Sequence, residues 1–487
     1  MFEKLFKLKE HNTDVKTEIL AGITVFMTMA YILAVNPNIL SATGMNSNGV
    51  FIATALSAFF GTLLMALFAN YPFALAPGMG LNAYFAYTVV LGMGYSWEIA
   101  LSAVFVEGVI FILLSVTNIR TAIFNAIPLT LKTAVSVGIG LYIAIIGLKN
   151  ANIVTNGLSL FSVDGYVAAN NLTAGSVGMH DVGITVLLAI IGTLITGILV
   201  AKNVKGNILL GILATWILGI ICQVAGLYIP NPDAGFYSLI PSGIVSFALG
   251  DIKEVAFKIR FSDVISGKDN LVNFIVVVFA FLFVDLFDTI GTLIGVSSKA
   301  GLLDKDGKLP KIKGALLADA IATTFGAVLG TSTTTTYIES ASGVTEGGRT
   351  GLTALTTAIL FGLALFFSPI FLAIPSFATA PALIVVGFYM VTNIVNIDFA
   401  DAFEAIPAYI CMIAMPFFSS ISEGISMGVI SYTVLHLVNR KENKKIYEVD
   451  IRWILWWNSI AASKYVRKCS KDKQQSCLCC FDGLPAN

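Results

Sequence analysis

The sequence predicts an all-α membrane protein that crosses the bilayer many times, and three observations carry this prediction. Of 487 residues, 56% are hydrophobic and only 12% are charged, whereas a soluble chain usually has about 25% charged residues. The mean hydropathy is +0.85. The apolar residues are grouped in runs of about 20, the length that spans a bilayer as a helix. The apolar composition predicts the lipid bilayer as a partner. The formal net charge is 0, so we expect no nucleic acid as a partner.

Taken in order, the apolar runs predict about 14 crossings by the length rule. Eleven are long enough: 18–36, 50–70, 97–117, 129–148, 182–201, 206–228, 270–296, 351–373, 380–396, 402–420 and 421–438. Three more are short or contain proline, glycine and polar residues: 73–91, 314–329 and 331–348.

The crossings divide into two halves of about seven each. We expect a first repeat at 18–228 and a second at 270–438, joined by an extracytoplasmic connection at 229–269. That connection is mixed in charge and has no spanning run. An odd number of crossings per half would place the two repeats in opposite orientations in the membrane.

Lysine and arginine in the loops predict the orientation of the chain. The loops at 118–132, 202–205 and 299–313 are basic, as is the stretch after 438, and all fall on the side of the N-terminus. The acidic loop at 397–404 is an exception on that side. The opening segment, 1–17, is charged and unlike a signal peptide. We therefore expect a protein of the cell membrane with both termini in the cytoplasm.

The third crossing of each half is interrupted. These stretches are "NYPFALAPGMGLNAYFAY" at 70–87 and "GTSTTTTYIESASGVTEGG" at 330–348. Interrupted segments at matching places in two repeats indicate the binding site of a transporter. Backbone that leaves the helix at membrane depth must be buried in protein or line a water-filled cavity. The alternative for 330–343 is a polar surface loop.

Local chemistry predicts the same backbone at both interruptions. Pro72 and Pro77 prevent a continuous helix, and the run of threonines favours extended chain. Gly78 and Gly80 allow unusual φ angles and close approach. We expect a short extended segment followed by a half-helix in each crossing. The two helix N-termini would meet near the midplane and offer unpaired N–H groups.

Ionisable residues inside the apolar runs are few and are functional candidates by default. Asp285 and Asp288 are three residues apart and share one helical face, and Asp319, Glu339 and Glu107 lie in other runs. Burial and mutual repulsion favour the protonated form of paired carboxylates, as proton symport requires. The alternative is that these carboxylates only bond backbone or hydroxyl groups between helices, and for Glu107 the two readings are even.

Other classes of protein are disfavoured. We find neither G-x-x-x-x-G-K-[ST] nor H-E-x-x-H, so we expect no nucleotide-driven pump, no metal and no cofactor. An intramembrane aspartyl protease needs its two aspartates on different helices, whereas Asp285 and Asp288 share one. The remaining class is a secondary transporter, not an enzyme, with protons favoured over sodium as the coupling ion.

Four stretches in this order carry a resemblance to a known family. "NYPFALAPGMGLNAYFAY", "FVDLFDTIGTLIGV", "LLADAIAT" and "GTSTTTTYIESASGVTEGGRTGL" resemble the adenine/guanine/hypoxanthine permease branch of the nucleobase–cation symporters. The resemblance covers about residues 1–440. It implies two inverted seven-helix repeats, a core domain from crossings 1–4 and 8–11, and a gate domain from crossings 5–7 and 12–14 that often forms a homodimer. It also implies proton-coupled purine uptake by alternating access.

The resemblance further implies roles for single residues. Asn82, Glu339 and either Asp285 or Asp288 would surround the base. Asp319 and the other aspartate would link protonation to movement of the core. Which purine is taken up, among guanine, hypoxanthine and adenine, stays open.

Purine chemistry agrees with these side chains. A carboxylate accepts a pair of ring and amino N–H groups, and the hydroxyl of Thr336 would serve the base's acceptors. Tyr337, Tyr84 and Phe85 would stack on the ring, or they pack the interior. A carrier of another small solute or an anion on the same fold is the alternative, but the spans contain no central arginine or lysine.

The stretch at 439–487 is expected to be a cytoplasmic tail and departs from the family's pattern after about residue 450. Cys469, Cys477, Cys479 and Cys480 lie there, without the spacing of a disulfide framework. No function is assigned to this tail.

Overall fold

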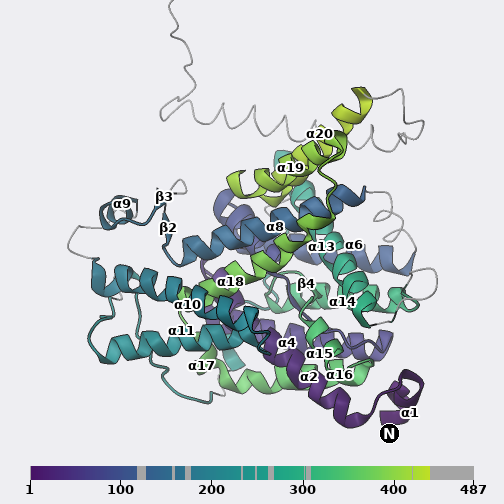
Figure 1. The fold of residues 1–487 in the computed structure, drawn as a ribbon, viewed down its shortest axis with the longest axis horizontal. Helices are drawn as coiled ribbons and strands as arrows, with labels where there is room; N and C mark the ends of the chain where they lie inside the picture. The colour runs from purple at the N-terminus through teal and green to yellow at the C-terminus, as the bar shows by residue number, and fades with distance from the viewer. Residues whose placement is uncertain are drawn as a thin grey trace, which may run out of the picture.

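The fold is almost entirely helical, as a computed structural model of the chain shows (Figure 1). The structure describes residues 2–117, 128–155, 159–169, 177–231, 234–246, 249–261, 268–300, 302, 309–418 and 420–438. The tail at 439–487, including its cysteines, lies outside these residues.

The first half contains the elements of seven crossings. Their bounds are α2 (Val15–Met29) with α3 (Ile32–Ser41), α4 (Ser47–Leu64) with η2 (Met65–Ala69), β1 (Leu75–Pro77) with α5 (Met79–Ala83) and η3 (Tyr84–Gly92), α6 (Trp97–Val116), α8 (Leu129–Asn150), η5 (Met179–Gly183) with α10 (Ile184–Ala201), and α11 (Asn207–Val224). Short elements lie outside them: α1 (Phe2–Phe6), η1 (Leu8–His11), β2 (Val154–Thr155), β3 (Ser159–Leu160), α9 (Val163–Ala169) and η7 (Leu249–Glu254).

The second half repeats this order. Its elements are α13 (Lys268–Ala300), α14 (Ile312–Leu329), β4 (Thr334–Thr336) with α15 (Ser340–Thr345), α16 (Gly351–Ala364) with η8 (Leu365–Phe367) and α17 (Ser368–Leu372), α18 (Ser376–Val391) with η9 (Thr392–Asn396), α19 (Ala402–Phe418) and α20 (Ile421–Val438).

The helices agree with the predicted crossings, with one correction. Among the described residues, nine helices are long and apolar enough to span a membrane, and three shorter apolar helices lie within α13, α19 and α20. We expected the run at 314–329 to be compromised, but α14 is unbroken over 18 residues. Asp319 is fully buried in it, so its polar side chain faces protein and does not interrupt the helix.

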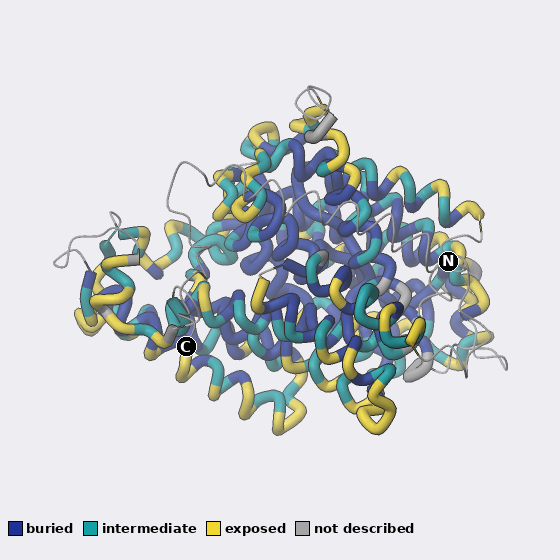
Figure 2. Tube along the Cα trace, turned by 90° about the horizontal axis from the view of Figure 1, so that it is seen from above, coloured by how far each residue is buried: buried dark blue, intermediate teal, exposed yellow. Residues whose placement is uncertain are grey.

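The helices pack in two groups. The core comprises α2 to α6 and α13 to α17, in which α16 packs on α2 and α4, and α14 packs on α4 and α6. The gate comprises α8, α10, α11 and α18 to α20, in which α18 and α19 pack on α8. Burial is concentrated in the middle of the molecule and exposed residues lie at its periphery (Figure 2).

Small residues allow the closest contact in the gate, where α8 crosses α18. A Cβ placed on Gly387 would lie 2.5 Å from the carbonyl oxygen of Gly140. No side chain fits there, which is how small residues let membrane helices approach each other. The two gate helices, one from each half of the chain, therefore meet backbone to backbone.

The two interrupted crossings pair with each other. β1 and β4 are antiparallel, with Ala76 opposite Thr335. The pairing continues beyond the strands, because the Gly78 amide donates to the Thr333 carbonyl at 2.9 Å and the Tyr337 amide donates to the Ala74 carbonyl at 3.0 Å. Extended backbone deep in a membrane protein needs such partners, and each interruption supplies them to the other.

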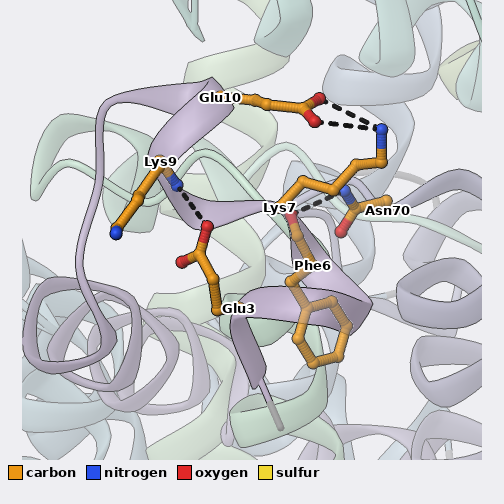
Figure 3. A network of polar contacts seen from close by, with 6 residues as sticks. All are labelled: Glu3, Phe6, Lys7, Lys9, Glu10 and Asn70. Atoms are coloured by element: carbon orange, nitrogen blue, oxygen red, sulfur yellow. Dashed lines mark hydrogen bonds and ion pairs between the residues drawn. The ribbon is translucent and has the colours of Figure 1, made fainter.

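The start of the chain packs against the core (Figure 3). Phe6 and Leu8 are buried in a small apolar cluster with Ala66 and Leu352. The Asn70 side chain donates to the Phe6 carbonyl at 3.0 Å, and its oxygen accepts from the Gly351 amide at 2.9 Å. Asn70 thereby joins the N-terminal segment, the end of η2 and the start of α16.

Candidate functional site

The half-helices begin where the two strands end. β1 runs through Gly78 into α5 and η3, and β4 runs through Tyr337 and Glu339 into α15. Gly78 has φ −72°, so the expectation of unusual φ is wrong at this residue. The expectation of close approach is right, since a Cβ on Gly78 would lie 2.6 Å from the Thr335 methyl carbon and 3.4 Å from Asp288 Oδ2.

Asn82 is fully buried on α5 and joins the two interruptions. Its Oδ1 accepts a hydrogen bond from the Ser332 hydroxyl, and its Nδ2 donates to the Pro77 carbonyl at 3.4 Å. The side chain therefore links crossing 3 to the stretch that leads into β4. Nothing in the sequence singled out Ser332 from the other hydroxyl residues beside it.

Asp285 and Asp319 meet at a threonine that the sequence did not single out. The Thr289 hydroxyl oxygen lies 2.9 Å from Asp285 Oδ1, 3.0 Å from Asp319 Oδ1 and 2.7 Å from the Thr335 hydroxyl. All four side chains are buried. The predicted aspartates of crossings 8 and 9 are thus brought together with the strand of crossing 10.

Asp288 lies three residues after Asp285 on α13. It is half-buried beside Gly78 and is close enough to Asp319 and Glu339 for significant Coulombic repulsion. The two aspartates of α13 share one face, as predicted, but they have different neighbours. Asp285 contacts the Thr289 hydroxyl, whereas Asp288 lies beside Gly78 and near Glu339.

Glu339 lies at the edge of the core that faces the gate. Its Oε1 accepts a hydrogen bond from the Tyr31 hydroxyl at 2.8 Å. Ile338 beside it is 47% exposed, and the gate residue Tyr389 on α18 is within electrostatic range of the carboxylate. Tyr389 in turn accepts a hydrogen bond from Asn207 Nδ2 at 3.5 Å. The side chain is therefore placed between the buried core and the core–gate boundary.

Thr336 and Tyr337 differ in what their hydroxyls do. Thr336 is 2% exposed, and its hydroxyl has no hydrogen-bond partner among the described residues. Buried hydroxyls usually have a partner, so this one is unusual. The Tyr337 hydroxyl donates to the Pro77 carbonyl at 2.5 Å and braces the strand pair.

The two aromatic residues after Asn82 pack in the interior. Tyr84 and Phe85 are fully buried, and the Tyr84 ring meets Phe281 edge to face with centroids 4.8 Å apart. The Tyr84 ring therefore packs against α13. Among the described residues, no group of three or more histidine, cysteine or acidic side chains is arranged to hold a metal ion.

Three polar residues near the site carried weak signals or none. Tyr31 lies in an apolar run without a mark of its role, and Thr289 is one threonine among many. Glu107 on α6 is fully buried and accepts a hydrogen bond from the Thr333 hydroxyl at 2.7 Å. The sequence marked Glu107 only as a carboxylate within an apolar run. In the structure it contacts the residue just before β4, in the interruption of crossing 10.

Comparison with known proteins places this geometry in context. The sequence profile of a family described as the Permease family matches residues 16–427. The adenine permease AdeP of Escherichia coli (strain K12) is 42% identical over 438 residues, which is 90% of this chain and 91% of that protein. The guanine/hypoxanthine permease PbuO of Bacillus subtilis (strain 168) is 44% identical and covers 90% of this chain and 95% of its own.

Solved structures of distant sequence share the fold. The transmembrane domain of a cyanobacterial bicarbonate transporter, BicA, has a TM-score of 0.60 at 15% identity and covers 85% of this chain and 97% of its own. The murine anion transporter Slc26a9 has a TM-score of 0.59 at 11% identity, covering 88% of this chain and 69% of its own. The predicted architecture of two inverted seven-helix repeats with core and gate domains is confirmed.

Proposed function

Because this chain belongs to the Permease family, we propose that it imports purine nucleobases across the cell membrane together with protons, by alternating access. The observation that carries the proposal is the position of Glu339. It is a half-buried carboxylate at the core–gate boundary, with the unpartnered hydroxyl of Thr336 nearby in the chain. Relatives named as adenine and guanine/hypoxanthine permeases support purines as the solute.

The proposed substrate contacts use complementary hydrogen-bonding groups. Glu339 keeps one carboxylate oxygen on Tyr31, so the other is available to accept an N–H group of the base. Asp288 offers a second acceptor across from Gly78. Thr336 would donate to a ring nitrogen or oxo group, Tyr337 would hold the strand in place, and Asn82 would keep the two interruptions together. Guanine, hypoxanthine and adenine all present such groups.

Coupling to protons is supported by the density of carboxylates. Asp285 of α13 and Asp319 of α14 both contact the Thr289 hydroxyl, and Asp288 follows Asp285 on the same helix face, so carboxylates that could exchange protons are gathered in the core. We assign the proton-coupling role to these three residues. Protonation would reduce the charge repulsion that opposes closure of the core around a neutral base.

Alternating access requires the core and the gate to move relative to each other. Every proposed contact residue belongs to the core, and Glu339 faces the gate. We propose that the core carries the base past a fixed gate, with repeats at 18–228 and 270–438, the connection at 229–269 outside and both termini in the cytoplasm. Dimerisation through the gate would hold that domain still in the membrane.

An anion carrier on the same fold is the second candidate. The related folds include a bicarbonate transporter, but at 15% identity the likeness extends to the fold alone. The site gathers carboxylates, while β1, β4 and α5 contain no lysine or arginine and α14 contains only Lys313, near its start. An anion would meet repulsion there, so we favour the neutral base.

The test is uptake of radiolabelled hypoxanthine, guanine and adenine by cells that lack their own purine permeases, with uracil and xanthine as comparison bases. Uptake of at least one of the three purines that is abolished by a protonophore is the expected result. Glu339→Gln should lower uptake about ten- to hundredfold, the effect of losing a hydrogen bond to a charged group. Glu10→Gln, at an exposed glutamate of the N-terminal segment that pairs with Lys7, is the control.

Two results would count against the proposal. One is that none of the three purines enters cells whose membranes contain the protein. The other is that a well-expressed Glu339→Gln variant takes up purines as the parent chain does.

A further inference from the structure

The cluster around Thr289 joins three elements of the core. We define this threonine junction as Asp285 and Thr289 of α13, Asp319 of α14 and Thr335 of β4. Its three contacts all end on the Thr289 hydroxyl oxygen, at 2.9, 3.0 and 2.7 Å. All three distances lie in the range of hydrogen bonds between two oxygen atoms, and two of them are slightly longer than the most common oxygen–oxygen distance.

Counting hydrogens shows that these contacts need a carboxyl proton. A threonine hydroxyl donates one hydrogen and accepts at two lone pairs, while an ionised carboxylate only accepts. If Asp285 and Asp319 are both ionised, Thr289 can donate to one of them only. The other carboxylate oxygen would then face a lone pair at hydrogen-bond distance. Every contact is satisfied if the two carboxyl groups carry one proton or two between them. If they carry no proton, one contact has no hydrogen.

With one proton the arrangement is complete. One aspartate is a neutral carboxyl that donates to Thr289, Thr289 donates to the other aspartate, and Thr335 donates to the second lone pair of Thr289. Loading adds one proton to a carboxylate, and release returns that proton to water. Only an O–H bond forms or breaks, and the charge of the pair changes between minus one and minus two.

We propose that the threonine junction binds the transported proton and that Thr289 is the residue that positions it. This inference rests on the proposed proton-coupled function. Binding the proton holds α13, α14 and β4 together, and its loss separates them because two ionised carboxylates then repel each other across one hydroxyl. Since Tyr337 and Glu339 directly follow β4, the proton state reaches the proposed substrate contacts through the strand.

The ionisable groups around the junction are known for the described residues. Asp288 and Glu339 are the neighbouring carboxylates, and Glu107 of α6 reaches Thr333, two residues before Thr335. The elements α4, α5, η2 and β1 carry no charged side chain. The other ionisable residues on the described elements that pack against α13 and α14 are Glu98 of α6, Tyr142, Lys132 and Lys149 of α8, and Glu423, Tyr432 and His436 of α20.

The experiment separates proton coupling from substrate movement. The full chain is reconstituted in liposomes, and two rates are measured with labelled hypoxanthine, guanine or adenine, whichever the parent chain carries. One is accumulation driven by an imposed pH gradient, which moves protons. The other is exchange of labelled for unlabelled base at equal pH, which needs no net proton movement.

We expect Thr289→Val to lower gradient-driven accumulation about tenfold, as for the loss of one buried hydrogen bond, while exchange changes by less than about twofold. The pH profile of uptake should also move. Thr289→Ser keeps the hydroxyl and should restore accumulation. Thr324→Val is the matched control, because within the described part of the chain that hydroxyl bonds the carbonyl of Ala320 in its own helix, at 2.9 Å, and no other group. Accumulation by Thr289→Val equal to that of the parent chain would overturn the inference.

A second measurement keeps the inference testable if Thr289→Val does not fold or if no purine is carried. Infrared spectra of the purified full chain, compared between acidic and alkaline pH, should contain a protonated-carboxyl band. The band should weaken in Asp319→Asn and shift in Thr289→Ser. A band unaffected by both changes would overturn the junction. A sensitive band in a protein that carries no purine would support the junction and reject the proposed function.

Discussion

Tyr31 lies in the first crossing at the short break between the end of α2 at Met29 and the start of α3 at Ile32. Its side chain is almost completely buried, and its hydroxyl holds one oxygen of Glu339 at 2.8 Å. A hydrogen bond to one oxygen fixes the plane of the carboxylate and leaves the other oxygen aimed elsewhere. Tyr31 therefore constrains the orientation of the Glu339 carboxylate.

We predict that Tyr31→Phe raises the KM for purine uptake about tenfold, the cost of one hydrogen bond to a charged group at the lower end of its range. The aromatic ring is retained, so the packing around the break between α2 and α3 should be kept. Tyr87→Phe removes a comparable hydroxyl, which donates to Asn150 at 3.1 Å away from Glu339, and serves as the control. An unchanged KM in Tyr31→Phe would show that Glu339 is positioned by other contacts.

Glu107 supports the second interruption from behind. We predict that Glu107→Leu lowers the free energy of unfolding by about 1–3 kcal/mol, because the Thr333 hydroxyl loses its acceptor in a buried place. Glu107→Gln keeps an oxygen for Thr333 and should cost less. Thermal unfolding of the purified proteins in detergent measures both. Equal stability of the leucine and glutamine variants would contradict the assigned contact.

At this scale the sequence predicted the acids better than their partners. Asp285, Asp319 and Glu339 could be selected because a charged residue in an apolar run is rare. Thr289 and Tyr31 could not, since a threonine and a tyrosine are ordinary in such runs and only the fold brings them to a carboxylate. The functional roles assigned to the site residues all stay predictions: Asn82, Asp285, Asp288, Asp319, Thr336, Tyr337 and Glu339.

Among the elements, the start of α16 shows how a neighbouring helix completes a helix end. The first N–H groups of a helix have no partner within it. Here the Glu18 carboxylate of α2 accepts from the amides of Arg349 at 2.9 Å, Thr350 at 3.3 Å and Thr353 at 3.1 Å. A negative charge at this end is also favoured by the helix dipole.

We predict that Glu18→Ala lowers the free energy of unfolding by about 1–3 kcal/mol, because several buried amides lose their acceptor. Thermal unfolding in detergent measures the change. Glu10→Ala is the control, since Glu10 forms an exposed ion pair with Lys7 and its loss should change stability by less than about 0.5 kcal/mol. Similar melting temperatures for the two variants would show that α16 needs no partner from α2.

Periodicity and length predicted most elements to within a few residues, including the strand and half-helix at both interruptions. They failed for α14, because the pattern records that Asp319 is polar but not that protein surrounds it. Glu18, the first residue of the predicted crossing at 18–36, was not selected as a candidate for the same reason. A sequence window does not show which neighbour will bury a charge.

For the whole molecule, an ion pair between described residues joins the core to the gate. Lys205, in the turn between α10 and α11 of the gate, contacts Glu346 at the end of α15 in the core. The lysine side chain is largely exposed, so the pair contributes about 0–1 kcal/mol. That is enough to change the balance between two conformations of similar free energy, since 1.4 kcal/mol is a tenfold change.

We predict that Lys205→Glu shifts this balance away from the structure described here and changes the uptake rate up to about fivefold, in proportion to the lost pair. The exchanged pair, Lys205→Glu with Glu346→Lys, should return the rate towards that of the parent chain. Uptake rates measured at low and high salt check both. Failure of the exchanged pair to compensate would mean that each residue acts alone.

The division into two halves was visible in the sequence, whereas the sorting of crossings into core and gate came from the family resemblance. Loop charge and the number of crossings predict which side of the membrane each loop lies on. They do not say that α8 should pack on α18 rather than on its neighbour in the chain. That choice depends on close contacts such as Gly140 with Gly387, which involve residues far apart in sequence.

The pairing of β1 with β4 also has a consequence for synthesis of the protein. Pro77 leaves the ribosome with the first half, but Tyr337, which braces it, follows 260 residues later. During that interval the extended backbone of the first half has no strand to pair with and cannot remain exposed to lipid. The newborn first half must therefore be sheltered by water, by the insertion machinery or by a temporary partner. The transporter becomes a stable membrane protein only when its second half arrives.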